Sequence, residues 1–139
     1  MRLFLDTSAL AKRYVLESGS SELTELCRQA DEIVLSYICT VELISALNRL
    51  KREGKLSSSE YKKIKKSFGE DLKGATIVEL YPLVIRQAVQ CLEKTPIRSL
   101  DAIQIASAMV SDCDLFLSAD SRQTAAAKVM GLKSRLLDE

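Results

Sequence analysis

The sequence of 139 residues contains no histidine and no tryptophan. The missing histidine excludes catalytic triads, histidine acid–base pairs, phosphohistidine relays and metal sites built on imidazole. The four cysteines are far apart and form no CxxC pair, which excludes a typical zinc spacing and indicates reduced thiols in a cytoplasmic protein. Without a histidine partner, a cysteine nucleophile is not expected either. Catalysis by this chain would therefore depend on carboxylates, lysines or hydroxyl groups.

Long apolar runs are also missing. No stretch approaches the roughly 20 apolar residues that a membrane helix needs, and the apolar start MRLFLDTSAL is too short for a signal peptide. The composition, 47% hydrophobic and 28% charged, is that of an ordinary globular protein. The length suits one domain, so we expect a single domain over residues 1–139.

Short runs typical of buried strands alternate with helical patterns along the whole chain. The runs rich in branched or aromatic residues are Arg2–Leu5, Glu32–Leu35, Thr76–Leu80, Leu115–Ser118 and Lys133–Leu137. Helices are expected over Ala9–Val15, from Ser20 or Ser21 to Ala30, and over Thr40–Arg52, Ser57–Lys73, Pro82–Lys94, Ser99–Ser111 and Ser121–Met130. This alternation predicts an α/β fold, with a mainly parallel sheet of about five strands between two layers of helices.

Two aspartates directly follow strand-like runs. Asp6 comes after LFL, and Asp120 ends LFLSAD. Ligands of open α/β sheets bind beyond the carboxyl ends of the strands, which favours a functional role for both. Each could instead cap the following helix, and for Asp120 alone capping is the stronger interpretation. For the first helix, Ser8 is expected to be the cap, which would leave Asp6 free.

Two further acids lie within apolar helices. Asp101 belongs to a helix that is apolar nearly all round, so a buried carboxylate there would need Arg98 or a metal ion as its partner. Glu42 is the lone acid on a face with Cys39, Ser45, Ala46 and Arg49. The opposite face, expected to be core, carries Val41, Ile44, Leu47 and Leu50. Either acid alone has an ordinary explanation. Four carboxylates gathered at one sheet edge would instead require a divalent cation, and Mg²⁺ and Mn²⁺ prefer oxygen ligands.

The net charge of +1 conceals a strongly basic segment. Residues 49–66 contain eight cations and two acids, a net charge of +6, whereas the rest of the chain has a net charge of −5. A basic helical hairpin beside an acidic pocket suits a groove that binds phosphates, although two solvated helix faces would give the same pattern. The residues that we assign to such contacts are Arg49, Arg52, Lys55, Lys62 and Lys66.

Four segments resemble the PIN-domain family, and most closely the VapC-type toxins of prokaryotic toxin–antitoxin pairs. In chain order they are LFLDTSALAKRY, SYICTVELISALNRL, RSLDAIQIASAM and DLFLSADSRQTAAAKVMGL. The resemblance covers nearly the whole chain and implies the same three-layer α/β/α fold. It also implies a metal-dependent endoribonuclease that uses Mg²⁺ or Mn²⁺, a small antitoxin protein as partner, and a homodimer.

For the site, the resemblance implies that Asp6, Glu42, Asp101 and Asp120 form the acidic cluster, with Asp6, Asp101 and Asp120 as metal ligands. Thr7 and Ser118 occupy positions where the family often has a hydroxyl group that orients the acids. One departure concerns a second metal site. Some members have a further acid or amide shortly after the fourth carboxylate, whereas SRQT without an acid follows here.

Other functions remain as alternatives. A PIN-like regulatory module could bind metal and RNA without turnover, or be held inactive by a partner. A 5′-nuclease acting on DNA shares the acidic pocket, but 139 residues leave no room for an extra DNA-binding domain. A haloacid-dehalogenase-like phosphatase needs a second acid where Ser8 stands, and the paired acids of a receiver domain are not evident.

Overall fold

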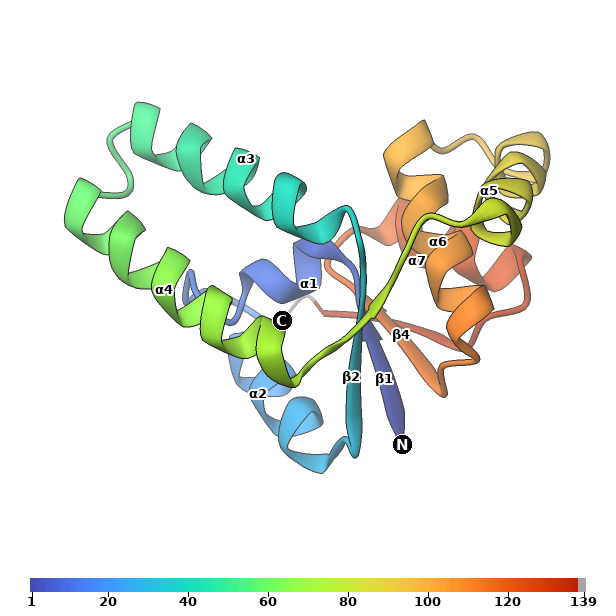
Figure 1. Cartoon of the computed structure of the whole chain (residues 1–139), viewed down its shortest axis with the longest axis horizontal. Coiled ribbons are helices and arrows are strands. Elements are labelled where there is room, and N and C mark those ends of the chain that lie inside the picture. Colours follow the sequence, from blue (N-terminus) through green and yellow to red (C-terminus); the bar gives the residue numbers. More distant parts are fainter. Residues whose placement is uncertain (138–139) are drawn as a thin grey trace.

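In a computed structural model that describes residues 1–137, five parallel strands form one sheet in the order β3-β2-β1-β4-β5 (Figure 1). The strands are β1 (Arg2–Leu5), β2 (Glu32–Ser36), β3 (Thr76–Val78), β4 (Leu115–Ser118) and β5 (Ser134–Leu136). The predicted parallel sheet of five strands is therefore confirmed. The third strand is shorter than predicted, because the chain leaves the sheet before Pro82 starts the next helix.

Seven helices of the described chain cover the sheet. They are α1 (Thr7–Ala11), α2 (Ser20–Gln29), α3 (Cys39–Arg52), α4 (Ser58–Gly74), α5 (Pro82–Lys94), α6 (Ser99–Ser111) and α7 (Ser121–Val129). Buried residues of α1 to α4 share one core cluster, and those of α5 to α7 share a second one. The two groups of helices lie on opposite sides of the strands (Figure 1). None of the helices described is long and apolar enough to cross a membrane.

The two cores result from the alternation of side chains along the central strands. In β1, Leu3 and Leu5 belong to the core under α1 to α4, whereas Phe4 belongs to the other one. The neighbouring strand β4 repeats this pattern, and the ring of its Phe116 stacks on that of Phe4 with centroids 5.6 Å apart. These strands are buried on both faces, as expected for parallel strands between two helical layers.

Local signals in the sequence set most helix ends. Ser57 and Glu60 form the expected capping box at the start of α4. Gly54, after α3, has a φ of 76°, a left-handed conformation that glycine adopts without strain. The first helix differs from its prediction because Asp6, and not Ser8, is the N-cap, and the helix ends at Ala11. Helix α6 has the predicted bounds, but Ser99, which was also expected to cap it, is its first residue, and Arg98 takes the N-cap position.

The predicted core face of α3 is wrong by part of a turn. The buried residues of this helix are Cys39, Leu43 and Leu47, whereas Val41 is 73% exposed. Cys39 had been placed on the face of Glu42, away from the core. The helix starts at Cys39, after β2 and a short turn, and its Leu43 packs in the core cluster that also contains Leu3 and Leu5 of β1. The three-to-four spacing alone does not show which face of α3 is buried, because apolar residues occur on both faces.

Candidate active site

The strand order places the ends of β1 and β4 side by side. From β1 the chain moves outward through β2 to β3, and then returns to β4 on the other side of β1. Leu5 pairs with Leu117, and the amide of Asp6 donates to the carbonyl oxygen of Leu117 at 3.1 Å. This is the point where strand order reverses, at which ligands of open α/β sheets bind. Asp6 follows β1 there, and Asp120 follows β4.

Each of the four predicted acids lies at the start of a helix. Asp6 and Asp120 are the N-caps of α1 and α7, and Glu42 and Asp101 lie in the first turns of α3 and α6. Helix N-termini favour negative charge, because their first amides have no partner within the helix. The capping role considered for Asp6 and Asp120 is therefore real, and it also fixes both carboxylates at the carboxyl edge of the sheet.

Asp6 is the most buried of the four acids, with 4% of its surface exposed. Its Oδ1 accepts hydrogen bonds from the Ala9 amide at 2.9 Å and the Ser8 hydroxyl at 2.7 Å. Burial raises the pKa of Asp6 to about 6, and the charge of Asp101 adds to this, while hydrogen bonds from Ser118, Ala9 and Ser8 act in the opposite direction. A carboxylate here is thus costly to ionise without a cation.

Asp101 is electrostatically coupled to the other acids. Burial raises its pKa, and the charges of Glu42 and Asp120 raise it further, whereas Arg122 and Arg98 act in the opposite direction. Arg98, one of the two partners considered for Asp101, forms no ion pair with it among the described residues and acts only through its charge. Carboxylates from α3, α6 and α7 therefore share one electrostatic environment, although they are distant in sequence.

Glu42 is held by two side chains. The Thr7 hydroxyl donates to its Oε1 at 2.8 Å, and Nε2 of Gln104 donates to the same oxygen at 2.7 Å. Nε2 of Gln104 also lies 3.0 Å from the Thr7 hydroxyl oxygen. This triangle joins the start of α1, the first turn of α3 and the second turn of α6. Thr7 therefore contacts one of the four acids, and its role in orienting that acid stays a prediction.

Ser118, the other predicted supporting residue, acts on the opposite side of the site. Its hydroxyl oxygen accepts a hydrogen bond from the Asp120 amide at 3.0 Å and lies 3.1 Å from the Ser8 hydroxyl oxygen. Ser8 donates in turn to Asp6, so a chain of hydroxyl groups connects the two strand-end acids.

Sequence reasoning missed Gln104 and Gln123. Both are 2% exposed, and in each Oε1 is buried without a hydrogen-bond partner in the described structure. Nε2 of Gln123 donates to the main-chain oxygen of Asp101 at 3.0 Å. Gln104 could have been found, because it follows Asp101 by three residues, on the same helix face, and is polar within an apolar run. Gln123 has no comparable signal in its SRQTAAAK context.

The carboxylate oxygens are suitable ligands for a hard divalent cation such as Mg²⁺ or Mn²⁺. Within residues 1–137, however, no three acidic or cysteine side chains lie close enough together to hold one ion. Mg²⁺ commonly binds one or two carboxylates and retains several waters, so such a site does not need three direct protein ligands. The residues fit a hydrated ion. Direct ligation by Asp6, Asp101 and Asp120 together stays a prediction.

The basic residues lie on the hairpin formed by α3 and α4. All five that were assigned to phosphate contacts are exposed, namely Arg49, Arg52, Lys55, Lys62 and Lys66. Figure 1 shows the two helices projecting together beyond the sheet, with their connection at the far end. Arg49 follows Glu42 by seven residues, two helical turns or roughly 10 Å along the same face. The hairpin thus extends away from the acidic site.

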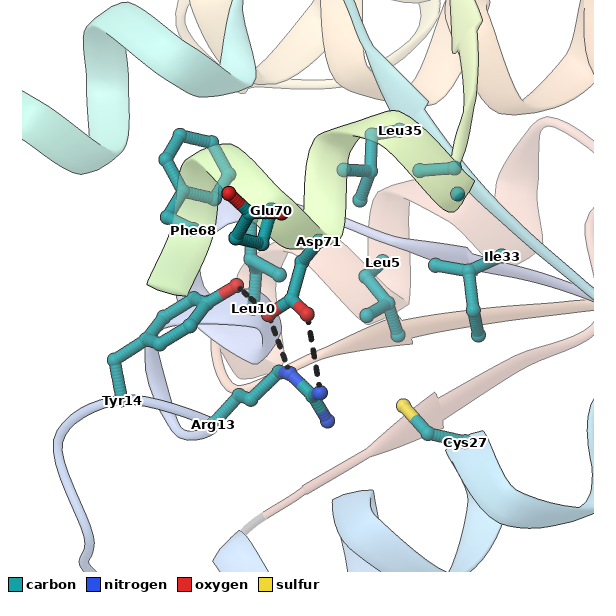
Figure 2. Close-up of a pocket in the computed structure, with 12 residues that line it drawn as sticks. Leu5, Leu10, Arg13, Tyr14, Cys27, Ile33, Leu35, Phe68, Glu70 and Asp71 are labelled. Atoms are coloured by element: carbon teal, nitrogen blue, oxygen red, sulfur yellow. Dashed lines mark hydrogen bonds and ion pairs between the residues drawn. The ribbon is translucent and has the colours of Figure 1, made fainter. Parts of the chain in front are cut away.

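A cavity of about 330 Å³ lies away from the acidic site, under α4 and beside α2 (Figure 2). Its walls are mainly apolar, and at its rim Asp71 accepts hydrogen bonds from Nε of Arg13 at 2.8 Å and the Tyr14 hydroxyl at 2.6 Å. Burial raises the pKa of Asp71, but these two bonds outweigh it and hold that pKa below its ordinary value. None of the four predicted acids lines this cavity, so it is separate from the acidic site.

Comparisons with known proteins give one family model and a set of solved structures with a similar fold. The family model described as "PIN domain" matches residues 3–129. The structure of VapBC2 from Rickettsia felis, bound to a DNA fragment from the promoter, has a TM-score of 0.72 and 12% identity, covering 99% of this chain and 100% of that one. The structure of VapBC-1 from Haemophilus influenzae has a TM-score of 0.71 and 14% identity, covering 99% of this chain and 98% of that one.

The Mycobacterium tuberculosis VapC20, described as a sarcin–ricin loop cleaving toxin, gives a TM-score of 0.69 and 15% identity, covering 89% of this chain and 94% of that one. No curated protein matches the chain significantly. At such low identity the solved structures establish the fold alone, whereas the family model spans nearly the whole chain. The chain therefore belongs to the PIN-domain family.

Proposed function

We propose that this protein is a divalent-metal-dependent endoribonuclease and the toxin of a toxin–antitoxin pair. The observation that best supports this proposal is that four acids from four separate segments lie near the point where the strand order of the sheet reverses. PIN domains are typically metal-dependent nucleases, which agrees with this acidic site. The resemblance to VapC20, whose description names cleavage of an RNA loop, favours RNA as the substrate.

In the proposed mechanism, Asp6, Asp101 and Asp120 would hold a Mg²⁺ or Mn²⁺ ion, directly or through its bound waters. When bound, such an ion makes a water more acidic and neutralises charge on the phosphate. Glu42 is fixed by Thr7 and Gln104 and orients the attacking water or accepts its proton. Because water attacks in line and the 2′-hydroxyl is not the nucleophile, the products should have 5′-phosphate and 3′-hydroxyl ends.

The direct test is incubation of the purified protein with a mixed RNA pool, with Mn²⁺ or with EDTA. We expect cleavage with Mn²⁺ alone, and 5′-phosphate ends when the fragments are sequenced. Products with 2′,3′-cyclic phosphates would contradict the mechanism. A parallel single-stranded DNA pool separates the ribonuclease from the DNA nuclease. RNA binding with no cleavage under any metal condition would instead support the regulatory module.

The partner is proposed from the relatives. Solved neighbours include a toxin–antitoxin complex from Klebsiella pneumoniae and FitAcB from Neisseria gonorrhoeae. We propose that a small antitoxin also binds this chain and blocks its acidic site, and that the chain forms a homodimer. The outer face of α5 is compatible with a dimer, because it exposes Ile85, Val89 and Leu92 along one stripe.

Replacing Gln104 by methionine is expected to lower the rate of RNA cleavage by about tenfold, because Glu42 loses one of its two fixing hydrogen bonds. The free energy of unfolding should change by no more than about 1 kcal/mol. The substitution removes a favourable bond to a carboxylate, but also the costly unpaired Oε1. Initial rates with Mn²⁺ and urea unfolding measure the two effects.

The matched control is Gln123→Met, since Gln123 is equally buried and also has an unpaired Oε1. Its amide donates to a main-chain oxygen and not to a carboxylate, so its loss should change the rate by less than about threefold. Equal effects of the two substitutions would show that packing, and not the orientation of Glu42, causes the loss.

The basic hairpin is tested by replacing Lys62, Lys63, Lys65 and Lys66 with glutamine, which forms helix nearly as well as lysine. We expect weaker RNA binding and a flatter dependence on salt. Each phosphate contact that is lost should lower the slope of log Kd against log salt by about 0.7 for a single strand, so two contacts give about 1.4. Fluorescence anisotropy at several salt concentrations measures this slope.

A variant with the same change in charge serves as its control. Arg86, Lys94, Lys128 and Lys133 are exposed and lie outside the hairpin. Their replacement by glutamine should lower the slope of log Kd against log salt less than the replacement of the four hairpin lysines does. If both quadruple variants lower the slope equally, the hairpin contributes only through overall charge.

A further inference from the structure

A small cavity of about 180 Å³ lies beside the acidic site, on the side of α6 and α7. Its walls are formed by Pro96, Ile97, Arg98, Asp101 and Arg122. Asp6 and Glu42 do not line it, so it is a neighbour of the acidic site and not its centre. Asp101 is the residue that the two share, and a ligand in the cavity would therefore lie next to a group bound at the acids.

The two arginines reach this cavity from different elements. Arg98 occupies the N-cap position of α6, and Arg122 lies in the first turn of α7. Each guanidinium carries five N–H donors in a rigid planar fork that suits phosphate oxygens. The walls between them are largely apolar at Pro96 and Ile97, and proline has no amide hydrogen to offer. The hydrogen-bond donors of the cavity are therefore mainly those of the arginines.

Neither guanidinium is committed to a strong internal partner. The side chain of Arg122 is 83% exposed, and its Nε lies 3.7 Å from Oδ1 of Asp120, beyond ordinary hydrogen-bond distance. Within residues 1–137, Arg98 forms no ion pair with Asp101, although both line the same cavity. Two cations thus stand beside two acids with most of their donors free. That arrangement suits an anion bound from outside better than an internal ion-pair network.

We propose that Arg98 and Arg122 together bind one backbone phosphate of the RNA, the one adjacent to the phosphate that is cleaved. This inference rests on the proposed function and specifies its substrate contacts. The acids and their cation act on the cleaved phosphate, and the arginines hold its neighbour on the side of Asp101. The apolar wall of Pro96 and Ile97 then faces the intervening ribose. This subsite fixes the register of the strand, because consecutive phosphates are separated by a single nucleoside.

The test measures binding and not cleavage. In an Asp6→Asn background, which slows hydrolysis, and in EDTA, a labelled pool of single-stranded 12-nucleotide RNAs is titrated with Arg98→Gln/Arg122→Gln protein. We expect affinity at about 0.1 M salt to fall at least tenfold, and the salt slope to fall by about 0.7, the value for one phosphate on a single strand. Arg86→Gln/Lys128→Gln is the control, with the same loss of charge at exposed positions outside the cavity.

Substituted RNAs locate the phosphate. With an RNA that wild type cuts at one position, neutral methylphosphonates replace the phosphates one at a time. A single position beside the cut should weaken binding to the Asp6→Asn parent by about tenfold and have no further effect once both arginines are glutamine. Equal losses in the control variant, or a sensitive phosphate that stays sensitive without the arginines, would overturn the inference alone. A parent that binds no RNA would overturn the proposed function together with it.

Discussion

Asp6→Asn protein is expected to cut RNA at least about 100-fold more slowly than wild type, and yet to be more stable without metal. The rate falls because an amide cannot replace a charged ligand of the cation. The stability rises because the ionised Asp6 is destabilising in the fold. Its pKa of about 6 lies above the ordinary value of 3.8, a cost on the order of 2–3 kcal/mol at pH 7.5. Asparagine should also keep the helix cap that Asp6 provides.

Asp112→Asn is the matched control for this variant. Asp112 is exposed at the end of α6, beyond the amino-terminal edge of the sheet, and has a φ of 56°, a conformation that asparagine tolerates. The same charge is therefore removed without strain and far from the acids. Rates of cleavage with Mn²⁺ and urea unfolding in EDTA are measured for both proteins. If Asp6→Asn protein keeps the full metal-dependent rate, Asp6 is not part of the catalytic site. If it is no more stable than wild type in EDTA, the ionised carboxylate of Asp6 does not destabilise the fold.

The sequence predicted the central strands better than the contacts at their ends. The boundaries of β1 and β4 are as expected, because both are short apolar runs with clear limits. Their adjacency was not predictable, since it depends on where the chain returns to the sheet after β3. That return is what brings Asp6 and Asp120 to neighbouring strand ends. Residues at the ends of strands can therefore be identified from sequence. Which of these residues come together in one site depends on the order of the strands in the sheet.

The roles of individual side chains were partly misassigned for a related reason. Ser8 was expected to cap the first helix, but its hydroxyl donates to Asp6, which is itself the cap. Both residues are good caps, and local sequence does not rank them. Gln104 was passed over because its helix was interpreted as uniformly apolar. Its polarity within that apolar run marks it as unusual, but its partners Glu42 and Thr7 approach it from α3 and α1, and no pattern within α6 identifies them.

The second large effect expected concerns metal and pH together. Without metal, the pKa values of Asp6 and Asp101 are raised in the fold, mainly by burial and further by neighbouring acids. The folded state then binds more protons than the unfolded state, so these two groups lower stability as pH rises. For Asp6 the fall should start near pH 4, the ordinary pKa of the carboxyl group, and be complete shortly above pH 6. Thermal unfolding in EDTA at a series of pH values from below pH 4 to above pH 7 measures this fall.

A divalent cation should reverse this trend, because it binds the ionised acids of the folded state only. At pH 7.5, Mn²⁺ at 100 times its Kd should stabilise the fold by about 2.7 kcal/mol, which raises the Tm by roughly 8 °C for a chain of this size. At pH 5 protons compete for the same oxygens, so the increase should be smaller. In Asp6→Asn it should shrink at every pH, whereas Asp112→Asn should behave as wild type. Two outcomes would place the bound cation away from these carboxylates. One is an increase in Tm that is larger at pH 5 than at pH 7.5, and the other is an equal increase in wild type and Asp6→Asn. An acidic site without its ion would not support hydrolysis of RNA.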